Sequence, residues 1–454
     1  MNFIALDIGS TSIKATTWDL EHLETIGPTV RVPSPTLLPG LPAGHFELDP
    51  AAVVNTVRGV LTSILSDVTD VAGIVNCNQM AGVILVDPEG KPLSNYLSWR
   101  DQRVLQRPPG STDSYYDLIC KHLTPKRLQQ LGHECKPGSA LSLLFWLHEN
   151  GHLPTAATPL MLGDYVAMQL AQADPVTEYT NSLGALNLDT GDWHYEACQK
   201  LGLSTLSWPT LSTPYTPIGT FKDANHSIPW YPSVGDHQCA LAGTLLKQEE
   251  LSINASTGSQ VSLLSGRYAP GDYQVRPYFD DQYLNTLTHL PAGRSLNALI
   301  DLLTELARSQ GTDPGDPWPY IMDAVATTET DLTSQLTFFA GPLGERGQIG
   351  NISVDNLTVG DLFQAAFQNM TDNYETCARR LTADQPWNTL VLSGGLVQRC
   401  HLLRDMIIKR LDMPCRLCPT EEETFQGLLA IALVASGQAE NLAEASTLVA
   451  QVHG

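Results

Sequence analysis

Two turns, far apart in the chain, place small hydroxyl residues beside glycine. The first is Gly9-Ser10-Thr11-Ser12, with Asp7 before it and Lys14 after it, and the second is Ser256-Thr257-Gly258. Closely spaced backbone N–H groups, hydroxyls and a cation suit phosphate groups, and a nearby carboxylate suits a hydrated Mg²⁺ ion. Taken alone, each turn is equally well explained as an ordinary hairpin turn.

A third glycine-rich turn, Gly394-Gly395-Leu396, follows a predicted strand and precedes a predicted helix. Glycine is needed where a side chain would collide with an approaching group. Such a pair is also common at the end of a strand. Its place before a helix favours contact with a ligand over a simple turn.

Asp236 lies between the first turn and the second, directly after Gly235 and before His237 and Gln238. A carboxylate in such a Pro- and Gly-bounded segment can withdraw the proton of an incoming hydroxyl as a phosphoryl group arrives. The competing interpretation is that Asp236 caps a helix beginning at Gln238. The local sequence leaves both interpretations open.

The elements that must position these residues alternate between strands and helices. Strands flanking Gly9 predict a hairpin, and the same pattern returns around Ser256. A loop-rich stretch is predicted to about Pro137. Apolar residues at helical spacing predict helices over 50–65, 139–151, 154–173, 295–309, 359–381 and 401–411. This pattern predicts an α/β fold.

The acidic run Glu421-Glu422-Glu423 begins another predicted helix, which extends to Gly437. Thr420 and Glu423 match a capping box. Adjacent carboxylates at a helix start complement the helix dipole and point in different directions. The run is therefore interpreted as a solvated helix cap and not as a metal site.

The chain has 454 residues, more than one hydrophobic core usually holds, so two domains are predicted. We place the first domain at residues 1–243 and the second at 244–454. No long Gly/Ser linker separates them, so the domains are expected to share a hinge. The cleft between them is the default position for a site.

The net charge of −22 makes nucleic acid and anionic membranes poor partners, so a small-molecule partner is expected. The nine cysteines are scattered and suggest a reducing compartment; Cys415 and Cys418 lack the further ligands of a zinc site. No stretch predicts a signal peptide or membrane span, and a cytoplasmic protein is expected. The oligomeric state is not predicted.

Together, the three turns resemble the nucleotide-binding parts of the actin, hexokinase and heat-shock-ATPase superfamily, in which two ribonuclease-H-like domains hold ATP in an interdomain cleft. Further segments resemble the FGGY carbohydrate kinases and occur in that family's order. These segments are GHFELDP at 44–50, NQMAGVILVD at 78–87, LSWRDQR at 97–103, GDHQCALAG at 235–243, GER at 344–346 and LSGGL at 392–396.

The resemblance implies a role for each matching position. Asp236 is implied as the catalytic base, and Asp7 together with Asp236 as Mg²⁺ ligands that act through water. The implied phosphate and ATP contacts are Gly9, Ser10, Thr11, Ser12, Lys14, Thr257, Gly258, Gly394, Gly395 and Leu396. The implied sugar contacts are Gln79, Met80, Ala81, Trp99, Asp101, Asp236, His237 and Gln238.

The expected sugar contacts differ in their roles. Trp99 is expected either to form an apolar wall for the sugar or simply to pack beside a loop. Asp101 is expected to accept a sugar hydroxyl while Arg103 orients it. Tyr278 and Phe279 are lower-ranked candidates for the opposite wall.

The resemblance implies transfer of the ATP γ-phosphate to a ketose. Xylulose kinases usually have His where this chain has Ala81, and the segments Asn254–Gln260 and Arg276–Phe279 look more similar to sedoheptulose kinases. Sedoheptulose is therefore favoured, with xylulose or another pentulose as the alternative. A catalytically inactive nucleotide-binding sensor of the same fold is the alternative from another class.

Overall fold

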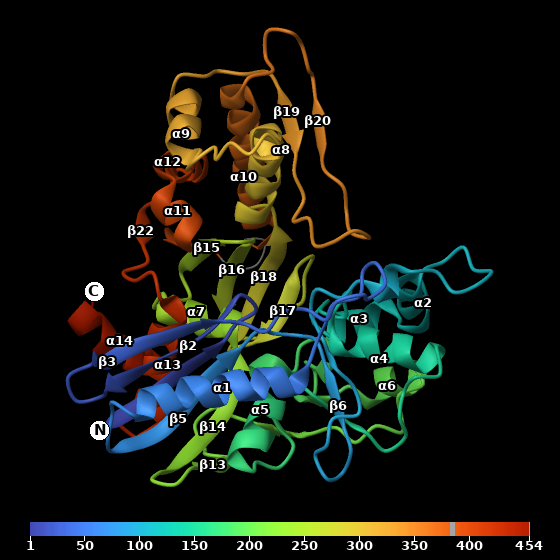
Figure 1. Cartoon of the computed structure of the whole chain (residues 1–454), viewed down its shortest axis with the longest axis vertical. Coiled ribbons are helices and arrows are strands. Elements are labelled where there is room, and N and C mark those ends of the chain that lie inside the picture. The colour runs from blue at the N-terminus through green and yellow to red at the C-terminus, as the bar shows by residue number, and fades with distance from the viewer. Residues whose placement is uncertain (382–385, 454) are drawn as a thin grey trace.

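The first of two six-stranded sheets has a mixed parallel and antiparallel arrangement (Figure 1). The computed structural model describes residues 1–381 and 386–453. The strand order is β13 (Gly219–Lys222), β14 (Ser227–Gly235), β5 (Val71–Asn78), β1 (Asn2–Ile8), β2 (Ser12–Asp19) and β3 (Glu24–Pro33). β5 runs parallel to both β1 and β14, and the outer pairs are antiparallel. Side chains on both faces of β1 are buried, as a central strand requires.

Helices cover one face of this sheet. α1 (Pro50–Leu65) begins with the Asp49 side chain accepting from the N–H of Ala51 and with a proline in its first turn, and both features favour a helix start. Its valines and leucines pack with α5 (Leu162–Ala171) against alternate residues of β1. The predicted helix over 50–65 is confirmed.

The second sheet carries the repeat of the first hairpin. Its strand order is β17 (Gln274–Pro277), β18 (Tyr283–Leu290), β16 (Ser259–Ser265), β15 (Glu250–Ala255), β21 (Thr389–Ser393) and β22 (Cys415–Leu417). Its outer face is covered by α8 (Gly293–Ser309), α9 (Trp318–Ala326), α10 (Val359–Leu381), α11 (Gly395–Arg399) and α12 (His401–Leu411). The predicted hairpin and the predicted helices over 359–381 and 401–411 are confirmed.

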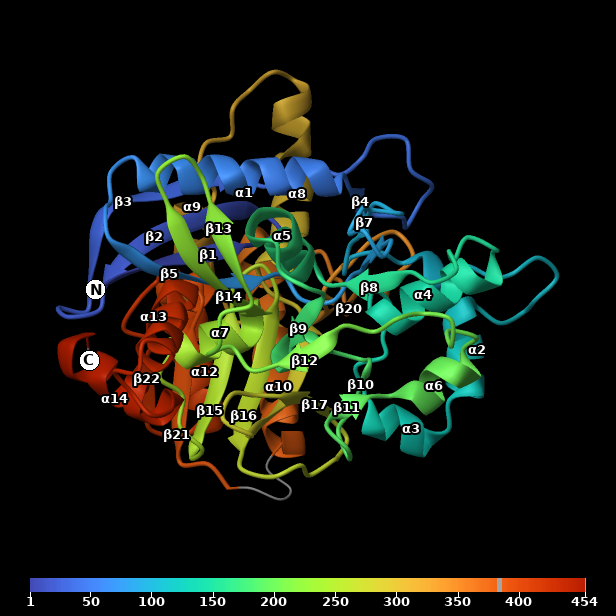
Figure 2. The same cartoon turned by 90° about the horizontal axis from the view of Figure 1, so that it is seen from below.

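Two helices fill the space between the sheets, as Figure 2 shows from below. They are α7 (Asp236–Gly243) and α13 (Glu423–Ala435). A Cβ atom on Gly243 would lie 1.8 Å from the carbonyl oxygen of Glu423, and one on Gly427 would lie 2.0 Å from that of Cys239. Only glycine permits this approach of two helix backbones.

The predicted domain boundary falls between the two sheets, after β14 and before β15. However, α13 and α14 (Leu442–His453) return to pack in the same core cluster as β1, β2 and β5. The division at Gly243 stays a prediction. The α/β class with two sheet-containing halves and a cleft between them is confirmed.

A separate group of short helices extends from the first sheet and has its own core. It contains α2 (Tyr115–His122), α3 (Pro125–Gln130), α4 (Ala140–Glu149) and α6 (Tyr195–Lys200). The prediction of loops up to Pro137 was wrong here, because α2 has a capping box between Ser114 and Asp117, and Thr124 caps α3.

Short elements complete the fold. They are β4 (Glu47–Leu48), β6 (Ile84–Val86), β7 (Tyr96–Leu97), β8 (Thr158–Leu160), β9 (Val176–Glu178), β10 (Leu186–Asn187), β11 (Asp192–Trp193), β12 (Thr210–Ser212), β19 (Thr333–Gln335), β20 (Gln348–Gly350) and 3₁₀ turns at Arg103–Leu105 and Tyr179–Asn181. The single helix predicted over 154–173 is a strand, β8, followed by α5. In the part of the chain described, every helix is too short or too polar to span a bilayer.

Candidate active site

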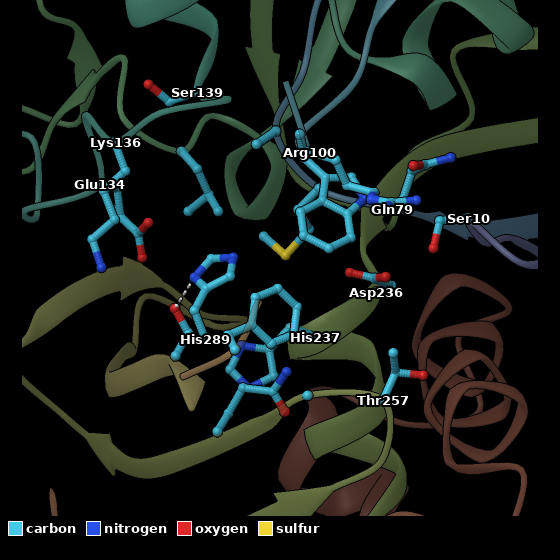
Figure 3. A pocket seen from close by; sticks show the side chains of 18 of the residues that line it. Ser10, Gln79, Arg100, Glu134, Lys136, Ser139, Asp236, His237, Thr257 and His289 are labelled. Atoms are coloured by element: carbon cyan, nitrogen blue, oxygen red, sulfur yellow. Dashed lines mark hydrogen bonds between the residues drawn. The ribbon is translucent and has the colours of Figure 1, made fainter. Parts of the chain in front are cut away.

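A cavity of about 340 Å³ lies where the two halves of the molecule meet (Figure 3). Both hairpin turns line it, through Ser10 and Thr11 from the first and Thr257 and Gly258 from the second. Asp236 lies beside these turns. The structure thus brings together residues that are about 250 positions apart in the sequence.

Six of the eight predicted sugar contacts line the same cavity: Gln79, Met80, Ala81, Trp99, Asp236 and His237. The first three follow β5 directly. Ala81 has a φ of +60°, a conformation that non-glycine residues rarely adopt, and its carbonyl accepts from the hydroxyl of Tyr96 at 3.1 Å. Strain of this kind is often found at functional sites.

Asp236 begins α7, whose N-cap is Gly235 with no side-chain cap. The alternative that Asp236 caps a helix beginning at Gln238 is wrong. Burial in the cleft, followed by the negative charge of Asp7, raises the pKa of Asp236 to about 7. The N–H of Gly235 donates to the hydroxyl of Thr180 at 2.8 Å, which fixes the backbone that carries this carboxylate.

Lys14 does not line the cavity. Its ammonium lies 2.5 Å from Glu422 Oε2 and 3.4 Å from Asp7 Oδ2, and it also lies 4.9 Å from the centre of the Phe425 ring. Burial disfavours its charge, but these carboxylates outweigh burial and raise the pKa of Lys14. Lys14 was predicted to contact phosphate. In the structure it links the first hairpin to the start of α13.

The prediction of a solvated acidic cap was wrong for two of its three residues. Glu422 pairs with Lys14 and Arg31. Glu423 accepts from the N–H of Gly394 at 2.9 Å, so no capping box with Thr420 forms. Both contacts join α13 to distant parts of the chain, which sequence spacing cannot indicate.

The third glycine turn adjoins the second hairpin outside the cavity lining. Gly394 has a φ of +90°, and a Cβ atom there would lie 2.4 Å from the carbonyl oxygen of Ala255. Gly395 faces open space, and Leu396 continues into α11.

In the first hairpin turn, Gly9 is also tightly placed. A Cβ atom there would lie 2.9 Å from the carbonyl oxygen of Ser12, the first residue of β2.

Two predicted sugar contacts are buried away from the cavity. Asp101 is fully buried, and Arg103 donates to both of its oxygens at 2.8 Å, while the N–H of Phe46 donates to one of them at 2.8 Å. Gln238 is also fully buried, and its amide donates to the carbonyl of Pro277 at 3.1 Å. The orienting role of Arg103 is confirmed, but the carboxylate it holds has no free face.

Trp99 packs against aromatic rings that the sequence did not single out. Its ring centre lies 6.0 Å from that of His289 and 6.3 Å from that of Phe338, and all three residues line the cavity. Tyr278 and Phe279, the predicted wall, pack in the core between the sheets and line a different cavity. That expectation was wrong.

His237 lines the cavity in the neutral state. Arg276 Nη1 donates to its Nδ1 at 2.9 Å, so the ring proton lies on Nε2, which is 3.4 Å from the hydroxyl of Ser262. Burial, then the charge of Arg276, lowers the pKa of His237 well below its usual value. Arg276 also pairs with Glu134 at 2.5 Å.

Sequence reasoning missed most of the charged lining of the cavity. The missed residues are Arg100, Glu134, Lys136, Arg276, His289 and Arg294. Arg276 begins the R-P-Y-F segment and was within reach of motif reasoning. Glu134 and Lys136 lie in a loop without a recognisable pattern, and only the fold brings them to the cavity.

The residues present fit a hydrated divalent cation. Asp7 Oδ2 contacts Lys14 and Thr424, whereas its Oδ1 points toward Gly9 in the first turn. Asp7 is close enough to Asp236 for their charges to interact. Two carboxylates that repel each other beside hydroxyl-rich turns suit Mg²⁺ bound partly through water.

Comparison with known proteins gives a family match. A sequence model described as "FGGY family of carbohydrate kinases, N-terminal domain" matches residues 2–241. A xylulose kinase of Staphylococcus xylosus is 24% identical over 283 residues, which cover 58% of this chain and 56% of that protein. The chain thus spans little more than half the length of this curated relative.

Solved structures have the same fold. A xylulose kinase of Lactobacillus acidophilus superposes with a TM-score of 0.80 at 16% identity, covering 100% of this chain and 92% of that one. A gluconate kinase of the same organism superposes with a TM-score of 0.81 at 16% identity, with the same coverage. These structures extend the similarity to the second half of the chain.

Proposed function

This chain belongs to the FGGY family of carbohydrate kinases, and from that premise we propose that it transfers the γ-phosphate of ATP to a sugar hydroxyl beside Asp236. One observation carries the proposal. A single cavity is lined by both hydroxyl-rich turns and by a carboxylate whose pKa is raised to about 7. That combination supplies phosphate contacts and a proton acceptor to the same small volume.

Asp236 is the catalytic base in this proposal. As the sugar oxygen attacks the γ-phosphorus, its O–H proton passes to the carboxylate and ADP leaves. A base with a pKa near the working pH is both available in the ionised form and strong enough to accept the proton. The hydrogen bond from Gly235 to Thr180 holds the base in position.

The two hairpin turns hold the phosphates of ATP, including the γ-phosphate that is transferred. Ser10 and Thr11 line the same end of the cavity as Thr257 and Gly258, so backbone N–H groups and hydroxyls come from both halves. A Cβ atom on Gly258 would lie 2.5 Å from the ring of Phe338, so glycine keeps this turn close to the aromatic wall. Gly394 and Gly395 give the adenosine room beside the second hairpin.

Asp7 and Asp236 would hold Mg²⁺, in part through water. When bound, the ion offsets the negative charge of the phosphates as transfer proceeds. Asp7 stays fixed for this role by the hydroxyl of Thr424, 2.9 Å from its Oδ2.

The sugar lies against Gln79, Met80 and Ala81, with Trp99 as an apolar wall. Within the ketoses we favour sedoheptulose, with xylulose or another pentulose as the alternative, because of the segments around Asn254 and Arg276. The protein acts on small molecules, and its location is proposed to be cytoplasmic.

The test is ADP release with Mg-ATP against ketoheptoses, ketopentoses, glycerol and aldoses. Sugar-dependent release with at least one ketose is expected. Phosphorylation of glycerol or an aldose alone would reject the ketose assignment. ATP binding without ADP release for any sugar would instead support an inactive nucleotide-binding sensor.

A further inference from the structure

The end of the cavity opposite the hairpin turns contains a cation without a counter-charge. Lys136 lies there with Glu134 and Ser139, across the cavity from Ser10 and Thr257 (Figure 3). Within residues 1–381 and 386–453, no hydrogen bond or ion pair of the Lys136 ammonium is found, although its backbone is well bonded. A partly buried charge without a partner carries a desolvation cost, so its retention suggests a partner that arrives with the ligand.

The nearest carboxylate is already engaged. Glu134 accepts from Arg276 at 2.5 Å and from the amide of Gln274 at 2.8 Å. Burial lowers the pKa of Lys136, Glu134 and Glu345 oppose that effect, and Arg276 and Arg380 add to it. Arg276 and Glu134 therefore compensate each other, and Lys136 remains as the uncompensated charge.

A helix N-terminus points to the same end of the cavity. α4 begins at Ala140, directly after Ser139, and no side chain caps its first turn. Ser139 itself lines the cavity. Unsatisfied N–H groups and the positive end of the helix dipole favour an anion there, in addition to the Lys136 charge.

The loop that carries Lys136 is held firmly. A Cβ atom on Gly138 would lie 2.0 Å from the carbonyl oxygen of Trp99, and the carbonyl of Gly138 accepts from the N–H of Gly82 at 2.9 Å. The loop thus rests on the backbone of the sugar-binding segment. Lys136 has a fixed position relative to Trp99 and Ala81.

Two further cations of the cavity lining, Arg100 and Arg294, lie near the second hairpin turn. The N–H of Arg294 donates to the carbonyl of Thr257 at 2.9 Å, and the Arg294 guanidinium stacks on Phe338. Arg100 lies close enough to Arg294 for their charges to interact. These two cations are placed to meet ATP phosphates, which leaves Lys136 for the acceptor.

We propose that the acceptor carries an anionic group, a carboxylate or a phosphate monoester, which Lys136 and the start of α4 bind at the end remote from the reacting hydroxyl. This inference rests on the proposed kinase function and narrows its substrate class from neutral ketoses to acidic ones. The reaction is unchanged: the hydroxyl loses its proton to Asp236, a new P–O bond forms, and ADP leaves.

The test compares acceptors that differ only at the remote end. Sedoheptulose is paired with sedoheptulose 7-phosphate, xylulose with xylulose 5-phosphate, and fructose with both fructuronate and fructose 6-phosphate. We expect kcat/KM for at least one acidic member to exceed that of its neutral partner by about tenfold or more. The fructose set shows whether the carboxylate or the phosphate is preferred.

Two variants separate charge from structure. Lys136→Met is expected to lower kcat/KM for the acidic acceptor at least tenfold through KM, and to leave the neutral partner within about threefold. Lys136→Arg keeps most of the preference. In the absence of ligand, Lys136→Met is expected to raise Tm, since it removes an unpaired and partly buried charge.

The outcomes distinguish this inference from the function on which it rests. Efficient turnover of neutral ketoses with weaker turnover of every acidic partner overturns the inference and leaves the kinase in place. An equal loss for both members of a pair in Lys136→Met also overturns it. No turnover with any acceptor overturns the kinase proposal; ligand-dependent Trp fluorescence then still tests whether acidic ligands bind more tightly than neutral ones.

Discussion

Arg276 donates to Nδ1 of His237 at 2.9 Å, and the same guanidinium pairs with Glu134 at 2.5 Å. One buried cation therefore fixes both the tautomer of a cavity histidine and the charge of a buried carboxylate. Although burial opposes it, the positive charge of Arg276 lowers the pKa of Glu134. Arg276 therefore organises this part of the cavity lining.

Removing Arg276 alone leaves Glu134 buried without its cation. We expect Arg276→Met to lower the free energy of unfolding by about 3–5 kcal/mol, the usual cost of breaking a buried pair. The double variant Arg276→Met/Glu134→Gln recovers more than half of this loss, because no unpaired charge remains. Urea denaturation measures both, and a loss below about 1 kcal/mol for the single variant would contradict the account.

The glycine pair at 394–395 offers a matched comparison. Gly394→Ala places an alanine at a φ of +90° and a Cβ atom 2.4 Å from the carbonyl oxygen of Ala255. We therefore expect it to lower the free energy of unfolding by about 1–3 kcal/mol. Gly395→Ala meets no atom within 4 Å and should leave stability nearly unchanged. Thermal unfolding compares the two. Titration with ADP then shows whether Gly395→Ala weakens nucleotide binding, as expected if the adenosine lies there.

The pH dependence of turnover follows from the base. Asp236 must be ionised to accept a proton, and its pKa is about 7, so kcat/KM for the sugar should fall as the pH drops below about 7. Well below this pKa, kcat/KM should fall tenfold for each pH unit. A rate that stays level down to pH 5 would show that another group accepts the proton.

The same carboxylate should reduce the stability of the folded protein at high pH. A carboxyl whose pKa is raised from 3.8 in the unfolded chain to about 7 on folding binds its proton more tightly when folded, so ionisation above pH 7 disfavours the folded state. Asp236→Asn should therefore raise Tm at pH 8. The difference in Tm between Asp236→Asn and the parent protein should shrink as the pH falls below 7 and vanish near pH 4. A variant less stable than the parent at pH 8 would contradict this.

Several features of the fold were predictable because local signals agree with the final structure. α1 has a capping residue, a proline and valines at helical spacing, and the two hairpins have glycine turns between apolar strands. The helix over 154–173 was predicted wrongly because a short buried strand, β8, has the same apolar character as a helix. Local pattern alone does not separate the two.

The candidate site was only partly predictable for a different reason. Asp236 and the hairpin turns lie in segments with family motifs. Lys14 was predicted to contact phosphate, and its pairing with Glu422 depends on a helix 408 positions away. Lys136 and Glu134 reach the cavity only through the packing of the helical group beside the first sheet.

The central claim is that Asp236 is the base of a sugar kinase, and one measurement tests it most directly. ADP release with Mg-ATP and the best ketose is compared between the parent protein and Asp236→Asn, which keeps the shape of the side chain, with ADP binding as the control for folding. We predict a fall of about 10³-fold or more in kcat with ADP affinity unchanged. Sugar-dependent turnover within about tenfold of the parent would contradict the account.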